Sequence, residues 1–201
     1  MEPFKTLDAI AAPIDTPNVD TDQIVPARFL WRKRGDGWSG QLFHDLRFDD
    51  NETPRPDFVL NRPAYEGARI LVAGRNFGCG SSREHAVWCL LDSGIRVVIA
   101  SSFGDIFHNN SYQNGLLPVT LSEDDVQALI ARLVARPGAH LAADLEHQTV
   151  TAADGEVYEF AIEPFRKECL LAGADDIGYT LRLDKDIDSF ERNYAARTPW
   201  Y

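Results

Sequence analysis

Residues 70–86 read ILVAGRNFGCGSSREHA, and they predict a buried strand, a glycine-rich turn and the start of a helix. The first four residues form an unbroken apolar run, which is typical of a strand covered on both faces. Three glycines within residues 74–80 allow positive φ angles and a close approach of the backbone to a ligand. The N–H groups and partial positive charge of a helix N-terminus follow directly, so the segment is suited to binding an anion.

Further apolar runs continue the alternation of strand and helix. Ser122 is a suitable N-cap for an amphipathic helix that follows the last of these apolar runs. Strands that alternate with helices indicate the α/β class, with a mainly parallel central sheet flanked by helices. The additional strands are predicted at residues 97–100 and 116–119, and the helices at residues 82–92, 103–110 and 123–136.

The two ends of the chain have a different character. A hairpin with an Asp-Gly turn is predicted for residues 149–160 and a helix for residues 163–172. Residues 184–197 are highly charged, and we expect a partly helical tail suited to docking. Near the N-terminus, residues 31–40 combine basic, glycine and aromatic residues, which is typical of an exposed functional loop. Because no linker separates these zones, we expect a single domain over residues 1–201 with a C-terminal extension.

The composition excludes several classes of protein. The formal net charge of −11 repels phosphate backbones, which argues against nucleic-acid binding. No apolar run reaches the roughly 18 residues of a membrane span, and the N-terminus lacks the pattern of a secretory signal, so we expect a cytoplasmic protein. Three cysteines, far apart and without a Cys-x-x-Cys pair, argue against a disulfide scaffold and against a metal centre held by this chain alone.

The loop before the central helix matches none of the common phosphate or hydrolase motifs. A P-loop lysine is missing, the third glycine of a dinucleotide fingerprint is replaced by Arg83, and no Gly-x-Ser-x-Gly elbow is present. Arg83 can hold a carboxylate with two parallel hydrogen bonds, and Ser81 beside it can act as a base on a neighbouring C–H group. The simpler alternative is that these serines only cap the helix. A hydrolase using Ser81 or Cys79 as nucleophile lacks a recognisable base nearby.

Residues 78–86 closely resemble the Gly-x-Gly-Ser-Ser-Arg-Glu-His-Ala signature of the swivelling domain of aconitase-type hydro-lyases. Three further blocks, within residues 18–30, 102–118 and 175–181, resemble motifs of the isopropylmalate dehydratase small subunits. These motifs follow one order over nearly the whole chain. The resemblance implies a β/β/α swivelling domain of aconitase type.

The resemblance also implies an activity and a partner. The reaction in this family moves a hydroxyl between neighbouring carbons of a malate derivative by loss and re-addition of water, in leucine biosynthesis. It assigns the base to Ser81 and the binding of a carboxylate of the small dicarboxylate substrate to Ser82 and Arg83. The hydro-lyase is expected to be active only as a heterodimer or larger assembly with a large subunit, whose thiolates hold a [4Fe–4S] cluster.

The same resemblance places further residues around the site. Leu30 and Trp31 are expected to contact the substrate side chain, and Asp20, Asp22 and Cys79 are expected to border the active site. Stabilisation of a turn is an equally good interpretation of the two aspartates. Alternative substrates are citraconate, methylmalate derivatives and homoaconitate, and an alternative role is that of a non-catalytic carboxylate-binding module.

Overall fold

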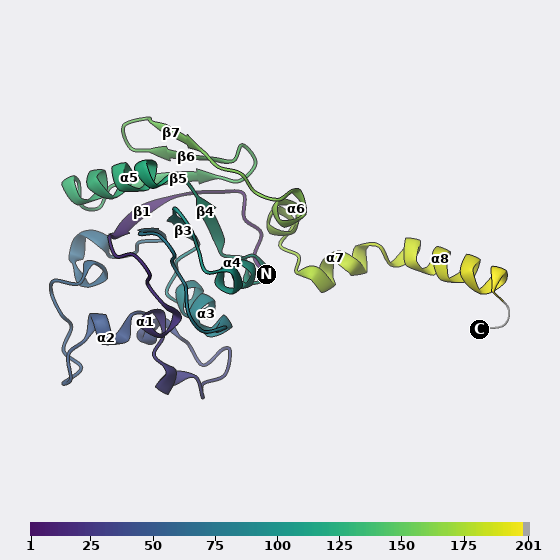
Figure 1. Ribbon diagram of the computed structural model, residues 1–201, viewed down its shortest axis with the longest axis horizontal. Helices are drawn as coiled ribbons and strands as arrows, with labels where there is room; N and C mark the ends of the chain where they lie inside the picture. The colour runs from purple at the N-terminus through teal and green to yellow at the C-terminus, as the bar shows by residue number, and fades with distance from the viewer. Residues whose placement is uncertain (199–201) are drawn as a thin grey trace.

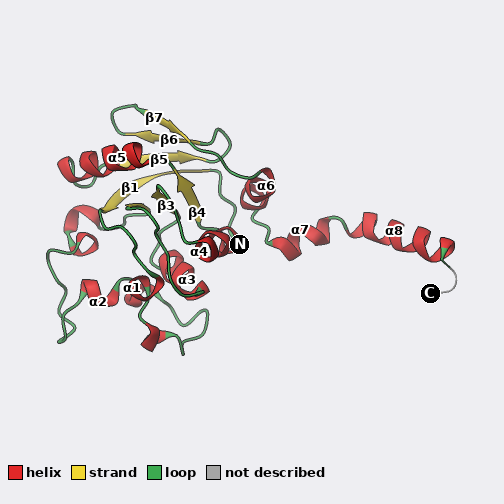
Figure 2. Ribbon diagram, viewed as in Figure 1, coloured by secondary structure: helices red, strands yellow, loops and turns green. Residues whose placement is uncertain are grey.

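The computed structural model describes residues 1–198, in which a seven-stranded mixed sheet is flanked by helices (Figure 1, Figure 2). The strand order is β4-β3-β2-β1-β5-β6-β7; strands β1 to β4 run parallel, and β5 to β7 add an antiparallel extension. The predicted fold class, with its mainly parallel central sheet, is therefore confirmed. The strands are β1 (Thr6–Ile14), β2 (Ile70–Ala73), β3 (Val97–Ala100), β4 (Leu117–Thr120), β5 (His140–Asp144), β6 (Thr149–Ala152) and β7 (Val157–Glu159).

Helices cover both faces of the parallel part of the sheet. One face carries α5, while α3 and α4 pack against each other on the opposite side (Figure 1). Single 3-10 turns occur at residues 27–29, 39–41, 59–61 and 63–65. The helices are α1 (Thr21–Ile24), α2 (His44–Arg47), α3 (Glu84–Asp92), α4 (Asp105–Asn114), α5 (Glu123–Ala135), α6 (Pro164–Ala172), α7 (Asp176–Arg182) and α8 (Asp184–Arg197).

The side chains of β2 divide between two hydrophobic cores. Ile70 and Val72 pack in the core that contains the apolar face of α5, and Leu71 and Ala73 pack in the core that contains α3. All four side chains are fully buried, which explains why the strand is an uninterrupted apolar run and not an alternating one. This double burial fixes the position at which the glycine-rich loop leaves the sheet.

Several predicted boundaries are confirmed to within one or two residues. Ser122 caps α5 by accepting a hydrogen bond from the backbone N–H of Asp125 at 3.1 Å. The hairpin forms as β6 and β7, and Gly173 ends α6 with a φ of +65°. Pro118 lies within β4, which the sheet tolerates because β4 is an edge strand and needs no second ladder of hydrogen bonds.

Strand β1 was not predicted from the sequence, although it is the centre of the sheet. It pairs with β2 on one side and β5 on the other. Its sequence, TLDAIAAPI, contains an aspartate, a proline and four alanine or threonine residues, so its apolar pattern is weak. Small side chains suit β1 because the strand contributes residues to both hydrophobic cores and is packed on both faces.

The C-terminal helices α7 and α8 extend away from the body as an arm (Figure 1). None of their residues is buried. Within residues 1–198, no helix combines the length and the apolar character needed to cross a bilayer.

Candidate functional site

Three loops meet at the carboxyl edge of the parallel strands. They follow β1, β2 and β3 and comprise residues 15–20, 74–83 and 101–104. Since parallel strands present their carboxyl ends at one edge, loops that are distant in sequence come together there. The predicted serines and arginine lie on the middle loop of the three.

The middle loop is bound on both sides by its neighbours through backbone hydrogen bonds. Gly78 N–H donates to the carbonyl of Val19 at 2.7 Å, and Thr21 N–H donates to the carbonyl of Cys79 at 3.0 Å. On the other side, Phe77 N–H donates to the carbonyl of Ser102 at 3.1 Å. The loop therefore has a defined shape before any ligand arrives, which lowers the entropy cost of binding.

Two glycines of this loop adopt conformations that other residues rarely adopt. Gly78 has a φ of +71° and Gly80 a φ of +88°. A Cβ atom on Gly78 would lie 2.2 Å from Cγ of Phe107, whereas a Cβ atom on Gly80 would lie no closer than 3.5 Å to any neighbour. Gly78 is thus required both by its backbone angle and by the close packing of the Phe107 ring.

Ser81 and Ser82 are exposed and precede the first turn of α3. The helix begins at Glu84 and not at residue 82, and no side chain caps it. The alternative that these serines serve only as N-caps is therefore wrong for this structure. Their hydroxyls remain available to a ligand near the positive end of a nine-residue helix.

Arg83 reaches across to α1 and forms an ion pair with Asp22. The side chain of Arg83 is only 16% exposed, and that of Asp22 is 54% exposed. The hydrogen bond from the guanidinium lowers the pKa of the Asp22 carboxyl below its ordinary value. Asp22 therefore remains ionised and orients the arginine beside the two serines.

Thr21 is a residue of the site that no sequence motif singled out. It is buried, and its hydroxyl donates to the backbone carbonyl of Ser81 at 3.0 Å. This contact fixes the main chain at the serine from the side of α1. The only sequence signal was its place between Asp20 and Asp22, which favoured a turn without indicating a contact 60 residues away.

Asp20 and Cys79 lie side by side and form an isolated parallel bridge between their backbones. Asp20 caps α1 in a capping box with Gln23, which is the turn-stabilising role considered as an alternative. Desolvation, followed by the charge of Asp20, raises the pKa of the Cys79 thiol. A thiol that resists ionisation is a poor nucleophile, which counts against the hydrolase alternative.

The loop of residues 31–40 is only partly the exposed loop that its composition predicts. Trp31 is 77% exposed, but Trp38 is completely buried, so the prediction is wrong for Trp38. The carbonyl of Trp38 accepts a hydrogen bond from the Cys89 thiol at 3.1 Å, and its ring packs near Trp88. The buried Trp38 anchors the loop against α3. Its burial could not be predicted from the sequence, because the neighbouring glycine and basic residues are typical of an exposed loop.

The two residues expected to contact the substrate side chain differ in burial. Leu30 is half-buried and packs against the core that contains α3, whereas the side chain of Trp31 is exposed to solvent. Arg34 from the same loop lies 4.0 Å from Glu84 at the start of α3. The loop therefore runs alongside the segment that carries the serines.

The cysteines of this chain do not fit an iron–sulfur cluster. Cys89 is buried and its pKa is raised to about 12, and Cys169 is also buried with a raised pKa, both chiefly through desolvation. Cluster ligands are thiolates, which these environments disfavour. Among residues 1–198, no three His, Cys, Asp or Glu side chains gather in a way that could hold a metal ion.

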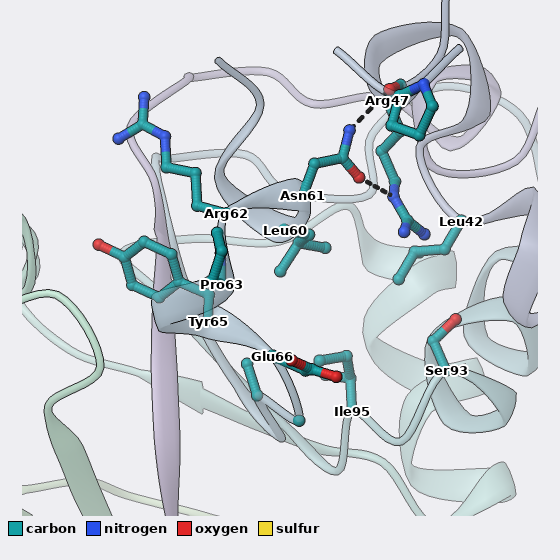
Figure 3. Close-up of a pocket in the computed structure, with 13 residues that line it drawn as sticks. Leu42, Arg47, Leu60, Asn61, Arg62, Pro63, Tyr65, Glu66, Ser93 and Ile95 are labelled. Carbon is teal, nitrogen blue, oxygen red and sulfur yellow. Dashed lines mark hydrogen bonds between the residues drawn. The ribbon is translucent and has the colours of Figure 1, made fainter. Parts of the chain in front are cut away.

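A cavity of about 460 Å³ lies at the other, amino edge of β2 and β3 (Figure 3). Arg47 and Asn61 are linked there by two hydrogen bonds, from Nε to Oδ1 at 3.0 Å and from the amide to the Arg47 carbonyl at 2.7 Å. Its lining includes none of the predicted site residues. The cavity and the predicted site residues therefore lie at opposite edges of the sheet.

Comparison with family models gives matches along most of the chain. Residues 1–124 match the aconitase C-terminal domain, and residues 127–164 match a model described as LeuD_N. Residues 176–201 match the C-terminal domain of the 3-isopropylmalate dehydratase small subunit.

Curated proteins and solved structures give a consistent result. The chain is 54% identical over 201 residues to the 3-isopropylmalate dehydratase small subunit of Phenylobacterium zucineum, with 100% of this chain and 98% of that protein covered. It is 53% identical over 200 residues to the protein of the same name from Rhodospirillum centenum, again with 100% and 98% covered. A crystal structure of 3-isopropylmalate dehydratase from Methanocaldococcus jannaschii is 27% identical, with a TM-score of 0.66, and covers 92% of this chain and 99% of that one.

Proposed function

Because the chain belongs to the family of 3-isopropylmalate dehydratase small subunits, we propose that its serine loop forms one half of the active site of this hydro-lyase. The enzyme interconverts 2- and 3-isopropylmalate in leucine biosynthesis by removing water and adding it back. The observation that carries the proposal is the exposed Ser81–Ser82 pair beside Arg83, on a loop already fixed by its neighbours.

Each of the three side chains has a part in this reaction. Arg83 has a planar guanidinium that matches a carboxylate with two parallel hydrogen bonds, and Ser82 supplies a further donor. Once the carboxylate is held, the adjacent C–H group lies against Ser81, whose oxygen accepts the proton. The positive end of α3 favours the negatively charged form of such an oxygen and of the bound carboxylate.

Asp22 determines how Arg83 is presented. The ion pair engages one terminal nitrogen of the guanidinium, and the remaining N–H groups can face a ligand. An arginine fixed in this way loses less side-chain entropy when a substrate binds. Asp22 is therefore a positioning residue for carboxylate binding.

The reaction needs a second chain. Expulsion of hydroxide from an unactivated carbon at neutral pH requires a Lewis acid or a strong acid on the departing oxygen. We propose that the partner large subunit holds a [4Fe–4S] cluster that supplies this Lewis acid. The large subunit also covers the exposed serine loop and excludes water from it. We further propose that the assembly is cytoplasmic and that this chain acts as a single domain with a C-terminal extension.

Leu30 and Trp31 are the proposed contacts for the substrate's alkyl group. Both are apolar, and Leu30 is partly held by the core beneath it. An isopropyl group suits an apolar wall, whereas a third carboxylate, as in homoaconitate, leaves a charge against it. Citraconate and other methylmalate derivatives remain the alternatives that place a smaller group at the same wall.

The experiment mixes the purified chain with the large subunit from the same source and supplies 2-isopropylmalate, citraconate and homoaconitate in competition. We expect no turnover by either chain alone and the highest kcat/KM for 2-isopropylmalate with both. Preference for another substrate would reassign the specificity while keeping the chemistry. Carboxylate binding by the isolated chain, with no turnover in the presence of the large subunit, would instead favour a binding module.

A further inference from the structure

The arm formed by α7 and α8, which projects from the body in Figure 1, exposes several large apolar side chains. An isolated helix of about 14 residues is only marginally stable in water, so a projecting helix of this length gains its stability from whatever it packs against. The exposed apolar side chains of the arm are Ile177, Leu181, Leu183, Ile187, Phe190 and Tyr194.

The apolar residues around α8 follow the spacing of a coiled-coil seam. Leu183, Ile187, Phe190 and Tyr194 are separated by four, three and four residues, which places them in one narrow stripe. Phe190 is 67% exposed, and its ring stacks on that of Tyr194 with centroids 5.9 Å apart. A seam of this kind packs against one partner helix or fits one groove and does not spread over a broad core.

The charges around the stripe determine which partner fits. Asp184 and Glu191 flank the stripe on one side and Asp186 on the other, and Arg197 is the one basic side chain of α8 beside the stripe, at its C-terminal end. Lys185 and Arg192 lie on the opposite face of the helix. In a pair of identical helices, parallel or antiparallel, the three acidic residues would bring like charges together along most of the stripe, and the single arginine at its end offsets only part of that repulsion. The stripe is therefore unsuited to a second copy of this chain and suited to a partner with Lys or Arg at its rim.

The root of the arm lies close to the proposed active site. Asp176 accepts a hydrogen bond from Gln113 at 3.5 Å, and the Arg166 guanidinium lies 3.4 Å from the same carboxylate. A hollow at this root is lined by Glu84, which directly follows the serine-bearing loop, and by Arg34 from the loop of residues 31–40. A subunit that covers the serine loop is consequently within reach of the arm.

We propose that the stripe on α8 docks into an apolar groove with a basic rim on the large subunit, and so holds the two subunits together. This inference rests on the proposed function, because it names the surface by which the same partner is bound. A helix of 14 residues spans about 21 Å, which sets the length of the groove. The arm contributes affinity, while Ser81 and its neighbours contribute chemistry.

The test compares the two faces of α8 in the full-length chain. We expect the double variant Ile187→Ala/Phe190→Ala to raise the Kd for the large subunit tenfold or more, since buried apolar anchors dominate such interfaces (roughly tenfold for each 1.4 kcal/mol). The matched control Lys185→Ala/Arg192→Ala, on the opposite face, should leave the Kd within about twofold of the parent. Because these positions are exposed, the fold of the body is unaffected, and kcat at saturating large subunit should equal that of the parent.

A second variant tests the rim. Asp186→Lys/Glu191→Lys should weaken binding of the large subunit, and raising the salt concentration should narrow the gap from the parent. A parent-like Kd for the apolar double variant would overturn the inference, as would self-association of the isolated chain that is lost in the same variant. If the parent chain binds no large subunit at all, the proposed function itself fails; if it binds and the stripe is neutral, only the docking surface is wrong.

Discussion

Replacing Gly78 with alanine tests whether the serine loop is held by the contact with Phe107. The left-handed φ of +71° costs an alanine about 1–2 kcal/mol. The new Cβ atom would lie 2.2 Å from a ring that is 2% exposed and packed against Phe77. Such overpacking adds roughly 1–3 kcal/mol, so the free energy of unfolding should fall by about 2–5 kcal/mol in total.

Gly80→Ala is the matched control for this experiment. Its φ of +88° carries the same backbone cost, but the nearest atom to its Cβ would lie at an ordinary 3.5 Å. Urea denaturation should therefore show a loss of only about 1–2 kcal/mol for Gly80→Ala. Adding Phe107→Leu to Gly78→Ala should recover part of the loss, with a coupling of about 1 kcal/mol or more. Equal losses for the two glycine variants, together with strict additivity of the double variant, would refute the contact as the cause.

Four other outcomes are expected. Asp22→Asn should lower the melting temperature at neutral pH, because the arginine partner lowers the pKa of Asp22 in the folded state. The difference in melting temperature from the parent should disappear as the pH falls below the ordinary aspartate pKa of about 4. A difference that persists at low pH contradicts the ion pair. Cys79, whose pKa is raised by desolvation, should react with iodoacetamide more slowly than free cysteine at pH 8 and accelerate at higher pH; rapid labelling at neutral pH would restore the nucleophile alternative. Ser122→Ala should cost about 1 kcal/mol in chemical denaturation through loss of the cap of α5, and an unchanged midpoint would contradict that role. Trp38→Ala should cost roughly 3–5 kcal/mol, whereas the exposed Trp31→Ala should be nearly neutral; similar effects would mean that the burial assigned to this loop is wrong.

The sequence predicted those elements whose local signals agree with their tertiary surroundings. The run at residues 70–73 is apolar on both faces because both faces are buried, and the glycines after it are required by the turn that follows. Ser122 combines a capping hydroxyl with an acidic first turn, so its helix could be placed to the residue. These features need no knowledge of distant segments.

Other features depend on contacts that no local pattern encodes. The central strand β1 is built from small and polar residues, because its neighbours on both sides supply the bulk of the two cores. Trp38 is buried by α3, which lies about 50 residues further along the chain, and glycines on either side gave it the composition of a surface loop. The pairing of Asp22 with Arg83 joins positions 61 residues apart, so sequence reasoning could name both residues without bringing them together.

The apolar stripe of α8 is a case in which the local pattern is clear but its exposure depends on the tertiary structure. The sequence predicts a charged tail that is partly helical, and the structure adds that none of the apolar side chains of α8 is buried by residues 1–198. The spacing of the seam and the signs of its flanking charges could both have been read from residues 183–194. The projection of the helix from the body, which shows that the stripe has no partner within the described residues, is not encoded in that local pattern.

The most direct test of the serine loop compares kcat of Ser81→Ala and Ser82→Ala. Each variant is saturated with the large subunit and with 2-isopropylmalate. If Ser81 accepts the substrate proton, its alanine variant should lose roughly 10²–10⁴ in kcat at a nearly unchanged KM. Ser82→Ala should act mainly on KM, because it removes one donor to the carboxylate. A Ser81→Ala enzyme that turns over at close to the parental rate would contradict the assignment, whatever the behaviour of its neighbour.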